Sequence, residues 1–345
     1  MIIGGAGIIG VSIALELHRR GARVMLLDRG EPGCEASSAA AGMLSAADPE
    51  TPAKLRALVR ESASLFPEFV RQIEEKSALK TDFRRRGTIA LEQHLPAPPE
   101  YRQLSTDALR ELEPSLENVG CTAFVVEEDS VDPALLMRAA LRAAENLGIE
   151  LRSNSEVREM RSREAQVEVI TADERFLAKA AVNCQGAWSG VPVRPRKGQM
   201  LYLQPERSGI LEHVVRAPDA YIVPRSTGKI LVGATVEDTG FEKSVQPETI
   251  RALHQAACKY LPRLASAQIS ASWAGLRPGS PDDLPLLGRT EQPGVFIASG
   301  HFRNGILLAP VTALIMADLI AGKTPAIDIS SFSPARFVNT IAGPA

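Results

Sequence analysis

The chain has 345 residues, with 45% hydrophobic residues, 23% charged residues and a formal net charge of −2. These proportions are typical of a globular protein large enough for two domains, and the small charge gives no reason to expect binding to nucleic acid or to an anionic membrane. No apolar run approaches the ~20 residues of a membrane span, and the four cysteines and five histidines show neither a CxxC pair nor metal-binding spacing. We therefore expect a cytoplasmic protein that has reduced thiols and binds no metal.

Glycines dominate the first turn of the chain, Gly5-Ala6-Gly7-Ile8-Ile9-Gly10, which lies between the strand stub Ile2-Ile3 and a helix predicted over 11–20. The stub is short by a few residues, so the natural start could lie upstream, and no signal peptide is expected before it. In such a turn Gly5 makes the bend, Gly7 lets the backbone approach a pyrophosphate, and Gly10 packs the helix against the strand. The helix N-terminus then faces the negative charge of the phosphates.

An acidic residue completes this pattern. Val24-Met25-Leu26-Leu27 is an apolar run typical of a parallel strand that is covered on both faces, and Asp28 follows it, 18 positions after Gly10. A carboxylate at this place accepts hydrogen bonds from a ribose hydroxyl, and it would repel the 2′-phosphate of NADP. The spacing therefore predicts a site for an adenine dinucleotide and leaves NAD and FAD open.

Helices and short strands make up the rest of the chain. We expect a helix over 52–73 that Pro67 kinks or breaks, and a solvated arginine run at 84–86 before a strand at 88–91. Asp132-Pro133 is a typical start for a helix that runs to Asn146. Further strands are predicted at 157–160, 167–170, 176–178 and 181–184, a β-rich region at 198–236, and helices at 247–261 and 306–321.

This order of elements predicts an α/β protein with two domains, because the chain enters the second domain twice. A Rossmann-like domain that binds the dinucleotide would be discontinuous and consist of residues 1–78, 130–192 and 276–345. Residues 79–129 and 193–275 would form an α+β domain that binds the substrate and contains a largely antiparallel sheet.

Several motifs in the same order resemble the FAD-dependent oxidoreductases of the D-amino-acid oxidase type, and among these the members that oxidise glycine. The resemblance spans nearly the whole chain. It rests on residues 3–10 and on Ser38-Ala39-Ala40-Ala41-Gly42-Met43-Leu44, Lys197-Gly198-Gln199, Tyr221-Ile222-Val223-Pro224-Arg225, Val232-Gly233-Ala234-Thr235, Trp273-Ala274-Gly275-Leu276-Arg277-Pro278 and Gly300-His301-Phe302-Arg303-Asn304-Gly305.

The resemblance implies an FAD that is bound without a covalent link, because none of the cysteines lies in an attachment motif. The glycine turn with Asp28 would hold the adenine half, and a helix that begins at 300–305 would turn its positive N-terminus to the flavin pyrimidine edge. The implied cofactor residues are Gly5, Gly7, Ile8, Ile9, Gly10, Asp28, Arg29, Ala36, Ser37, Ala41, Gly42, Met43 and Val157, with His301, Phe302, Arg303, Asn304, Gly305, Ile306 and Leu307 at the flavin end.

Arg277, Arg303 and Tyr221 are the residues that we expect to bind the substrate. The planar arginine fork matches the carboxylate of an amino acid with two parallel hydrogen bonds, and a tyrosine hydroxyl could donate to the same group. Two alternatives stay open, because either arginine could form an ordinary structural ion pair and Tyr221 could be a half-buried aromatic residue of a strand.

The resemblance implies the oxidative deamination of glycine and of other small amines or D-amino acids. Hydride passes from Cα to flavin N5, the product is an imine, and O2 is reduced to H2O2; the imine of glycine would serve thiazole and thiamine biosynthesis. Such a reaction needs orientation more than an acid or a base, so no catalytic side chain is expected and His301 is interpreted as a residue of the flavin loop. We expect a homo-oligomer. The alternatives are a D-amino-acid oxidase or dehydrogenase with another substrate and acceptor, an NAD dehydrogenase, and a non-catalytic flavoprotein.

Overall fold

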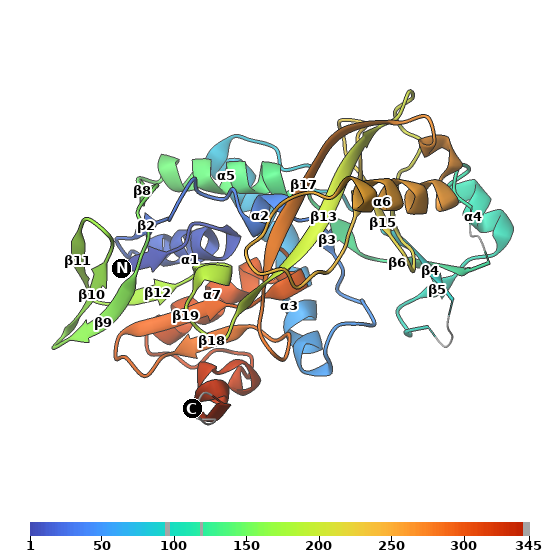
Figure 1. Cartoon of the computed structure of the whole chain (residues 1–345). Helices are drawn as coiled ribbons and strands as arrows, with labels where there is room; N and C mark the ends of the chain where they lie inside the picture. Colours follow the sequence, from blue (N-terminus) through green and yellow to red (C-terminus); the bar gives the residue numbers. More distant parts are fainter. Residues whose placement is uncertain (94–96, 118–119, 341–345) are drawn as a thin grey trace.

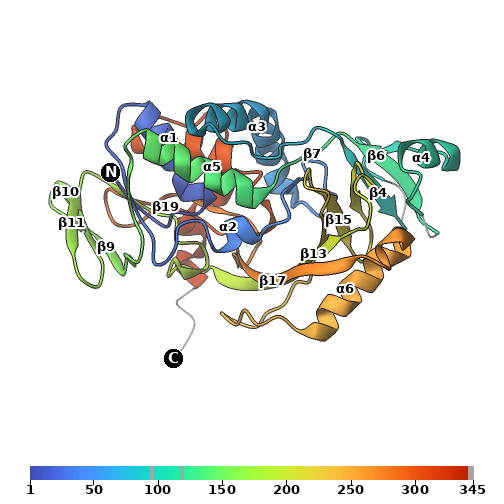
Figure 2. The same cartoon turned by 90° about the horizontal axis from the view of Figure 1, so that it is seen from above.

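The computed structural model describes residues 1–93, 97–117 and 120–340. Two large sheets lie side by side, with helices packed against each (Figures 1 and 2). The first has six strands in the order β18-β19-β12-β1-β2-β8, and all neighbours are parallel except β18 and β19. Its strands are β1 (Ile2–Gly4), β2 (Met25–Leu27), β8 (Glu150–Arg152), β12 (Ala181–Asn183), β18 (Leu286–Arg289) and β19 (Val295–Ser299).

The pleat of this sheet sends alternate residues to two different cores. Ile3, Leu26 and Val182 pack against a layer of helices, whereas Ile2 and Leu27 pack against a small three-stranded sheet. Because both faces are covered at the centre of the sheet, β1 and β2 are apolar at every position, as the run at 24–27 predicted. The helices are α1 (Ile8–Arg19), α3 (Arg56–Ser77), α5 (Pro133–Asn146) and α7 (Ala309–Ile320), and the small sheet consists of β9 (Glu159–Arg163), β10 (Gln166–Ile170) and β11 (Arg175–Ala178).

The second sheet has eight strands in the order β17-β13-β16-β15-β14-β4-β6-β5, and only β14 and β4 are parallel neighbours. On one face Leu201, Ile222 and Val232 pack beneath α6 (Pro247–Tyr260). Met200 and Leu231 lie on the other face. The strands are β4 (Thr88–Glu92), β5 (Arg102–Gln103), β6 (Thr122–Val126), β13 (Arg194–Gln204), β14 (Val214–Arg216), β15 (Tyr221–Pro224), β16 (Ile230–Gly233) and β17 (Gln268–Gly279), and α4 (Thr106–Leu112) lies at the far end.

The predicted α/β class and the largely antiparallel second sheet are confirmed. The strands of each sheet come from separate stretches of the chain, and the exact domain boundaries stay a prediction. Among the described residues no helix is long and apolar enough to cross a membrane, and none of the described groups of His, Cys, Asp and Glu could hold a metal ion. None of the four cysteines forms a disulfide bond.

Three predictions about elements are wrong in detail. Pro67 does not break its helix, because α3 runs from Arg56 to Ser77 and buries Phe66 and Val70 on either side of the proline. Arg84 is not fully solvated, since its side chain is 17% exposed, pairs with Glu212 and donates to the carbonyl oxygen of Pro224 at 3.0 Å. The last helix begins at Ala309 instead of Ile306.

Candidate active site

A cavity of about 580 Å³ lies between the two sheets, within the range of known ligand sites. Its wall combines segments that are far apart in the sequence: the glycine turn, the segment after β2, the end of β12, and the facing sides of β14 to β17. The lining includes Gly5, Gly7, Ile8, Ile9, Asp28, Arg29, Ala36, Ser37, Ala41, Gly42, Met43, Tyr221, Arg277, His301, Phe302, Arg303, Asn304, Gly305 and Ile306. Three predicted cofactor residues, Gly10, Val157 and Leu307, are not part of this lining.

The glycine turn has the local geometry of a phosphate-binding turn. Gly5 has φ +100°, a conformation that a residue with a side chain rarely adopts, and a Cβ there would overlap the backbone of Cys184. A Cβ on Gly10 would overlap the carbonyl oxygen of Gly5. Gly10 therefore sets the close approach of α1 to β1, which explains why it lies behind the cavity wall. Gly7 is the residue before the helix, and it lines the cavity.

The carboxylate of Asp28 accepts hydrogen bonds from two backbone N–H groups of the chain itself. Its Oδ2 accepts a hydrogen bond from the backbone N–H of Ala6 at 2.7 Å, and its Oδ1 accepts one from Gly30 at 3.0 Å. Burial raises the pKa of Asp28, against the lowering effect of these two N–H groups. Each carboxylate oxygen has a second acceptor position, so the side chain holds the turn and can still accept a ribose hydroxyl.

Small residues form the wall next to the turn. The short helix α2 (Ala36–Ala39) follows β2, and the hydroxyl of Ser37 accepts the N–H of Ile8 at 2.9 Å. A Cβ on Gly275 would lie 2.7 Å from the Cβ of Ala39, so β17 approaches α2 closely. Strand β3 (Met43–Leu44) continues the segment and pairs with β7 (Asp129–Ser130).

Two residues that the sequence analysis did not single out fix this wall. The indole Nε1 of Trp273 donates to the carbonyl oxygen of Ala39 at 3.1 Å. The guanidinium of Arg225, which is only 5% exposed, donates to the carbonyl oxygens of Ala41 at 2.7 Å and of Val131 at 3.0 Å. Both residues lie inside the quoted motifs. Their partners lie far away in the sequence, since Arg225 and Ala41 are 184 residues apart and Trp273 and Ala39 are 234 residues apart. The signal in the sequence was an arginine that directly follows the apolar strand Tyr221–Pro224.

Arg277 and Tyr221 lie close together on the wall of the cavity. Arg277, near the end of β17, donates from Nη1 to the carbonyl oxygen of Thr235 at 3.1 Å. Tyr221 is partly buried, and desolvation raises its pKa while the charge and hydrogen bond of Arg277 act against that rise. The tyrosine therefore stays protonated as a donor, and the two predicted substrate residues present a guanidinium and a hydroxyl to the same space.

Glycines make room for both side chains. A Cβ on Gly198 would overlap the guanidinium of Arg277, and one on Gly233 would lie 2.5 Å from the hydroxyl oxygen of Tyr221. Strand register explains these positions, because Tyr221 pairs with Gly233 across β15 and β16, and Arg216 pairs with Tyr221 across β14 and β15. Cross-strand partners share one face of a sheet. Arg216, Tyr221 and Gly233 thus form a row that faces the cavity.

Arg303 lies on the rim. Its side chain is 45% exposed and forms an ion pair with Glu50, which is the structural alternative that the sequence left open. The positive charge of Arg303 still acts on Tyr221, where it opposes the rise of the pKa that burial causes. Arg303 is therefore placed at the entrance, whereas Arg277 is placed inside.

The loop that contains His301 is a 3₁₀ turn at Phe302–Asn304, and α7 begins after it. The prediction that a helix starts at Gly300–Gly305 is therefore wrong, because Gly300 and Phe302 have positive φ angles and Pro310 fixes the first turn of α7. His301 is 2% exposed and its Nε2 lies 3.1 Å from the hydroxyl of Thr312. Burial lowers the pKa of His301 to about 3, so the imidazole is neutral near pH 7.

The model of one protein family, FAD dependent oxidoreductase, matches residues 1–319. The chain belongs to this family. Glycine oxidase from Pseudomonas aeruginosa is 33% identical over 97% of the chain and 98% of that protein. The bifunctional protein ThiO/ThiG of Trichormus variabilis is 34% identical over 98% of the chain. The chain spans only 55% of the length of that bifunctional relative.

Solved structures agree with this family. Glycine oxidase from Geobacillus kaustophilus has a TM-score of 0.91 and 32% identity, with 97% of this chain and 98% of that chain covered. Iminodiacetate oxidase from Chelativorans has a TM-score of 0.87 and 25% identity, over 96% and 98% of the two chains.

The residues present fit FAD, which is the cofactor of the family. The glycine turn offers backbone without side chains next to free N–H groups at the start of α1, the carboxylate of Asp28 follows β2, and the cavity continues from there to the loop at 301–306. In this family member the turn, Asp28 and Ser37 would hold the adenine side, and the loop residues would hold the flavin side.

Proposed function

We propose that this protein oxidises glycine and other small amines or D-amino acids, with O2 as the electron acceptor. The observation that carries the proposal is the proximity of the Arg277 guanidinium to the Tyr221 hydroxyl on the wall of the cavity. Bound FAD supplies the hydride acceptor for this chemistry. The names of the relatives from Pseudomonas aeruginosa and Geobacillus kaustophilus support glycine as the substrate.

The residues of this chain bind and orient the amino acid. Arg277 pairs with the carboxylate, and the Tyr221 hydroxyl donates to the same group. This fixes the amine and Cα toward the centre of the cavity, where the wall consists of small residues at 39–42. A substrate that is bound in this orientation has already lost most of the translational and rotational entropy that the reaction requires it to lose.

Neither His301 nor Tyr221 is placed to remove the proton of the substrate ammonium. His301 faces Thr312 and is buried, and Tyr221 keeps its proton because burial raises its pKa. The substrate must therefore arrive as the neutral amine or lose its proton to solvent at the rim. Activity should increase with pH toward the pKa of the free amine.

A substrate screen tests the proposal. The holoenzyme is mixed with glycine, sarcosine or D-alanine, and we measure H2O2 release in air and flavin bleaching without oxygen. Bleaching with peroxide is the expected result. Bleaching without peroxide would indicate a dehydrogenase that uses another carrier, and no bleaching by any of the three amines would refute the proposed substrate class.

We also propose a role in thiamine biosynthesis, in which the imine of glycine serves thiazole formation. This role is supported by the names of the ThiO/ThiG relatives. A cytoplasmic location and a homo-oligomer stay predictions. Light scattering on the purified holoenzyme would measure the mass of the assembly.

A further inference from the structure

A loop between β16 and α6 crosses from the second sheet to the first. We call residues 236–246 the strap. In Figure 1 the strap is the gold loop that leaves the inner end of α6 and passes in front of β17 and β13. Glu237, Asp238, Glu242 and Gln246 of the strap contact β13, whereas Phe241 contacts Trp188 and Lys243 contacts Glu35.

The base of the strap is fixed by a buried lysine. Lys197 on β13 has a fully buried side chain, and its Nζ lies 2.9 Å from Glu242 and 3.6 Å from Glu237. The backbones of Lys197 and Glu237 exchange two hydrogen bonds of 2.9 Å. Hydrogen bonds from Ser244 and Lys197 lower the pKa of Glu242 to about 2, so this carboxylate stays charged at neutral pH.

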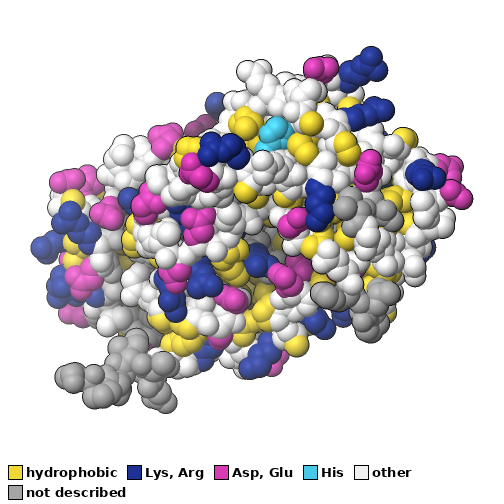
Figure 3. All heavy atoms as spheres, turned by 45° about the vertical axis from the view of Figure 1, so that its right-hand side comes forward, with side chains coloured by type: hydrophobic (Ala, Val, Ile, Leu, Met, Phe, Trp, Pro, Cys, Tyr) yellow, Lys and Arg dark blue, Asp and Glu magenta, His cyan; other side chains and the backbone are white. Residues whose placement is uncertain are grey.

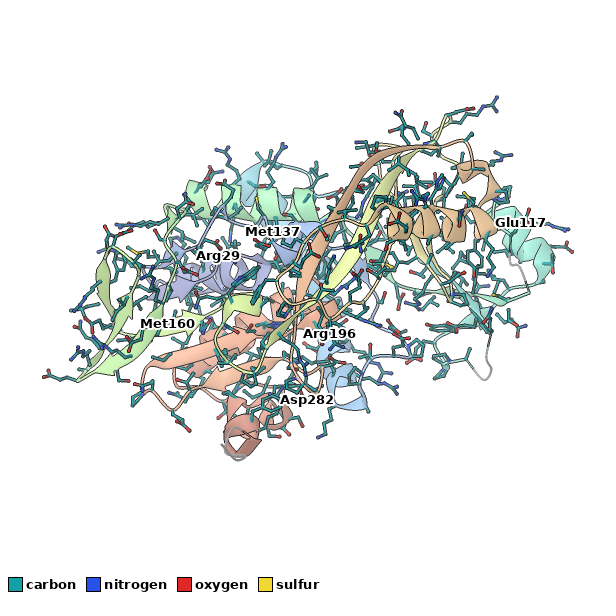
Figure 4. All side chains as sticks on the ribbon, in the orientation of Figure 1. Arg29, Glu117, Met137, Met160, Arg196 and Asp282 are labelled. Atoms are coloured by element: carbon teal, nitrogen blue, oxygen red, sulfur yellow. The ribbon has the colours of Figure 1, made fainter. Side chains whose placement is uncertain are left out.

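The tip of the strap reaches the first sheet. The ring of Phe241 lies 5.3 Å from the ring of Trp188, although Phe241 is 54% exposed. The guanidinium of Arg29 lies 4.2 Å from the same indole. Lys243 pairs with Glu35 at 2.9 Å, next to the start of α2. Figure 4 labels Arg29, which follows β2 and Asp28.

The tip therefore covers the dinucleotide end of the cavity. Arg29, Glu35 and Trp188 all line the cavity, as does Val236 at the start of the strap. The ring that Phe241 contacts belongs to Trp188, which is one of these lining residues. We propose that the strap closes over bound FAD and that Phe241 is a positioning residue that slows release of the cofactor.

This inference concerns the cofactor and does not depend on which amine is oxidised. Release of FAD would require Phe241 to leave Trp188 and Lys243 to leave Glu35. Aromatic pairs and exposed ion pairs are individually weak, so each contact should change the release rate by a modest factor. Their common anchor at Lys197 lets the two contacts act together.

The release rate of FAD tests the inference directly. Holoenzyme is diluted, and the rise of free flavin fluorescence is followed for the native protein and for Phe241→Ala, Phe241→Tyr and Leu177→Ala. We expect Phe241→Ala to release FAD about three to ten times faster, and Phe241→Tyr to stay near the native rate. Leu177, which is 63% exposed on β11, is the matched control for the loss of an exposed apolar side chain.

The salt dependence of FAD release tests the second contact, the ion pair between Lys243 and Glu35. In 1 M NaCl the native protein should release FAD faster, whereas Lys243→Ala should already be fast and change little. An unchanged rate in Phe241→Ala, with the native melting temperature, would overturn the inference. A native protein that purifies without any flavin would instead contradict the cofactor itself, so the two failures are distinguishable.

Discussion

The backbone of Gly198 lies directly beneath the guanidinium of Arg277, so closely that a Cβ at position 198 would overlap it. Gly198 belongs to β13 and pairs with Gly275 on β17, two residues before Arg277. Two strands therefore define the position of the carboxylate-binding group. Neither glycine needs a special φ here, since only the space that they leave matters.

The substitution Gly198→Ala should displace Arg277. We expect KM for glycine to increase about tenfold or more, because a misplaced guanidinium loses its hydrogen bonds to the carboxylate, while the flavin content stays native. Steady-state peroxide assays and the absorbance ratio of flavin to protein measure both quantities. Ser272→Ala, an exposed residue of the same strand pair, is the control, and a native KM in Gly198→Ala would contradict this account.

Arg277→Ala should nearly abolish the use of amino acids. Loss of one partner from a buried ion pair costs ~3–5 kcal/mol, and kcat/KM for glycine should fall by about a hundredfold to a few thousandfold. FAD binding should be unaffected. Should the variant keep a near-native kcat/KM, Arg277 does not bind the carboxylate, and Arg303 becomes the candidate.

Tyr221→Phe should weaken substrate binding less than Arg277→Ala, by about tenfold to a hundredfold, because it removes one hydrogen bond to a charged group. Since burial raises the pKa of Tyr221 above its ordinary value of 10, the native enzyme should not lose affinity for glycine at any pH below 10 through this residue. Titration of the holoenzyme with a carboxylate inhibitor between pH 7 and 10 measures the effect. A loss of affinity that Tyr221→Phe removes would show that the tyrosine ionises earlier.

His301 should make the fold sensitive to acid. Its folded pKa of about 3 lies below the ordinary value of 6.5, so the unfolded state binds more protons between these two pH values. The stability that comes from the neutral imidazole is complete above pH 6.5 and is lost as pH falls toward 3. The slope is at most one proton, about 1.4 kcal/mol per pH unit.

Urea unfolding of the native protein, His301→Gln and His18→Gln at pH 4.5 to 7.5 measures this dependence. The His301 variant should show the flatter pH profile, and the His18 variant should keep the native one. Equal slopes in all three proteins would mean that folding does not change the pKa of His301.

The sequence predicted the local backbone geometry of the glycine turn and the position of Asp28 next to it. The glycine turn, the buried strand and Asp28 lie within 28 residues, and their roles follow from backbone geometry that neighbouring residues set. The same is true of α5, where Asp132 accepts the N–H groups of Ala134 and Leu135 as its position predicted.

Contacts between distant strands could not be predicted in this way. The clearance that Gly198 gives to Arg277 depends on the register of β13 and β17, and the bond of Arg225 to Ala41 joins residues 184 positions apart. The pairing of Arg303 with Glu50 depends on a loop conformation. Register and loop shape are properties of the whole sheet and have no local pattern.

Surface charge follows the same mixed pattern that the composition predicted. Figure 3 shows Lys and Arg side chains interspersed with Asp and Glu over the face that carries the second sheet. This arrangement agrees with a formal net charge of −2. A zwitterionic amino acid that approaches this face is therefore not steered by a strong electrostatic field.

Strand β17 joins the two ends of the cavity. Gly275 packs against Ala39 of α2, and Arg277 follows two residues later on the same face. Two residues of a strand span about 6.6–6.8 Å. The short segment from Gly275 to Arg277 therefore sets the distance between Ala39 and the guanidinium that we propose to bind the substrate carboxylate. An insertion of one residue at 276 would turn Arg277 to the opposite face. The number of residues between Gly275 and Arg277 therefore has to stay constant, whatever the length of the rim loops.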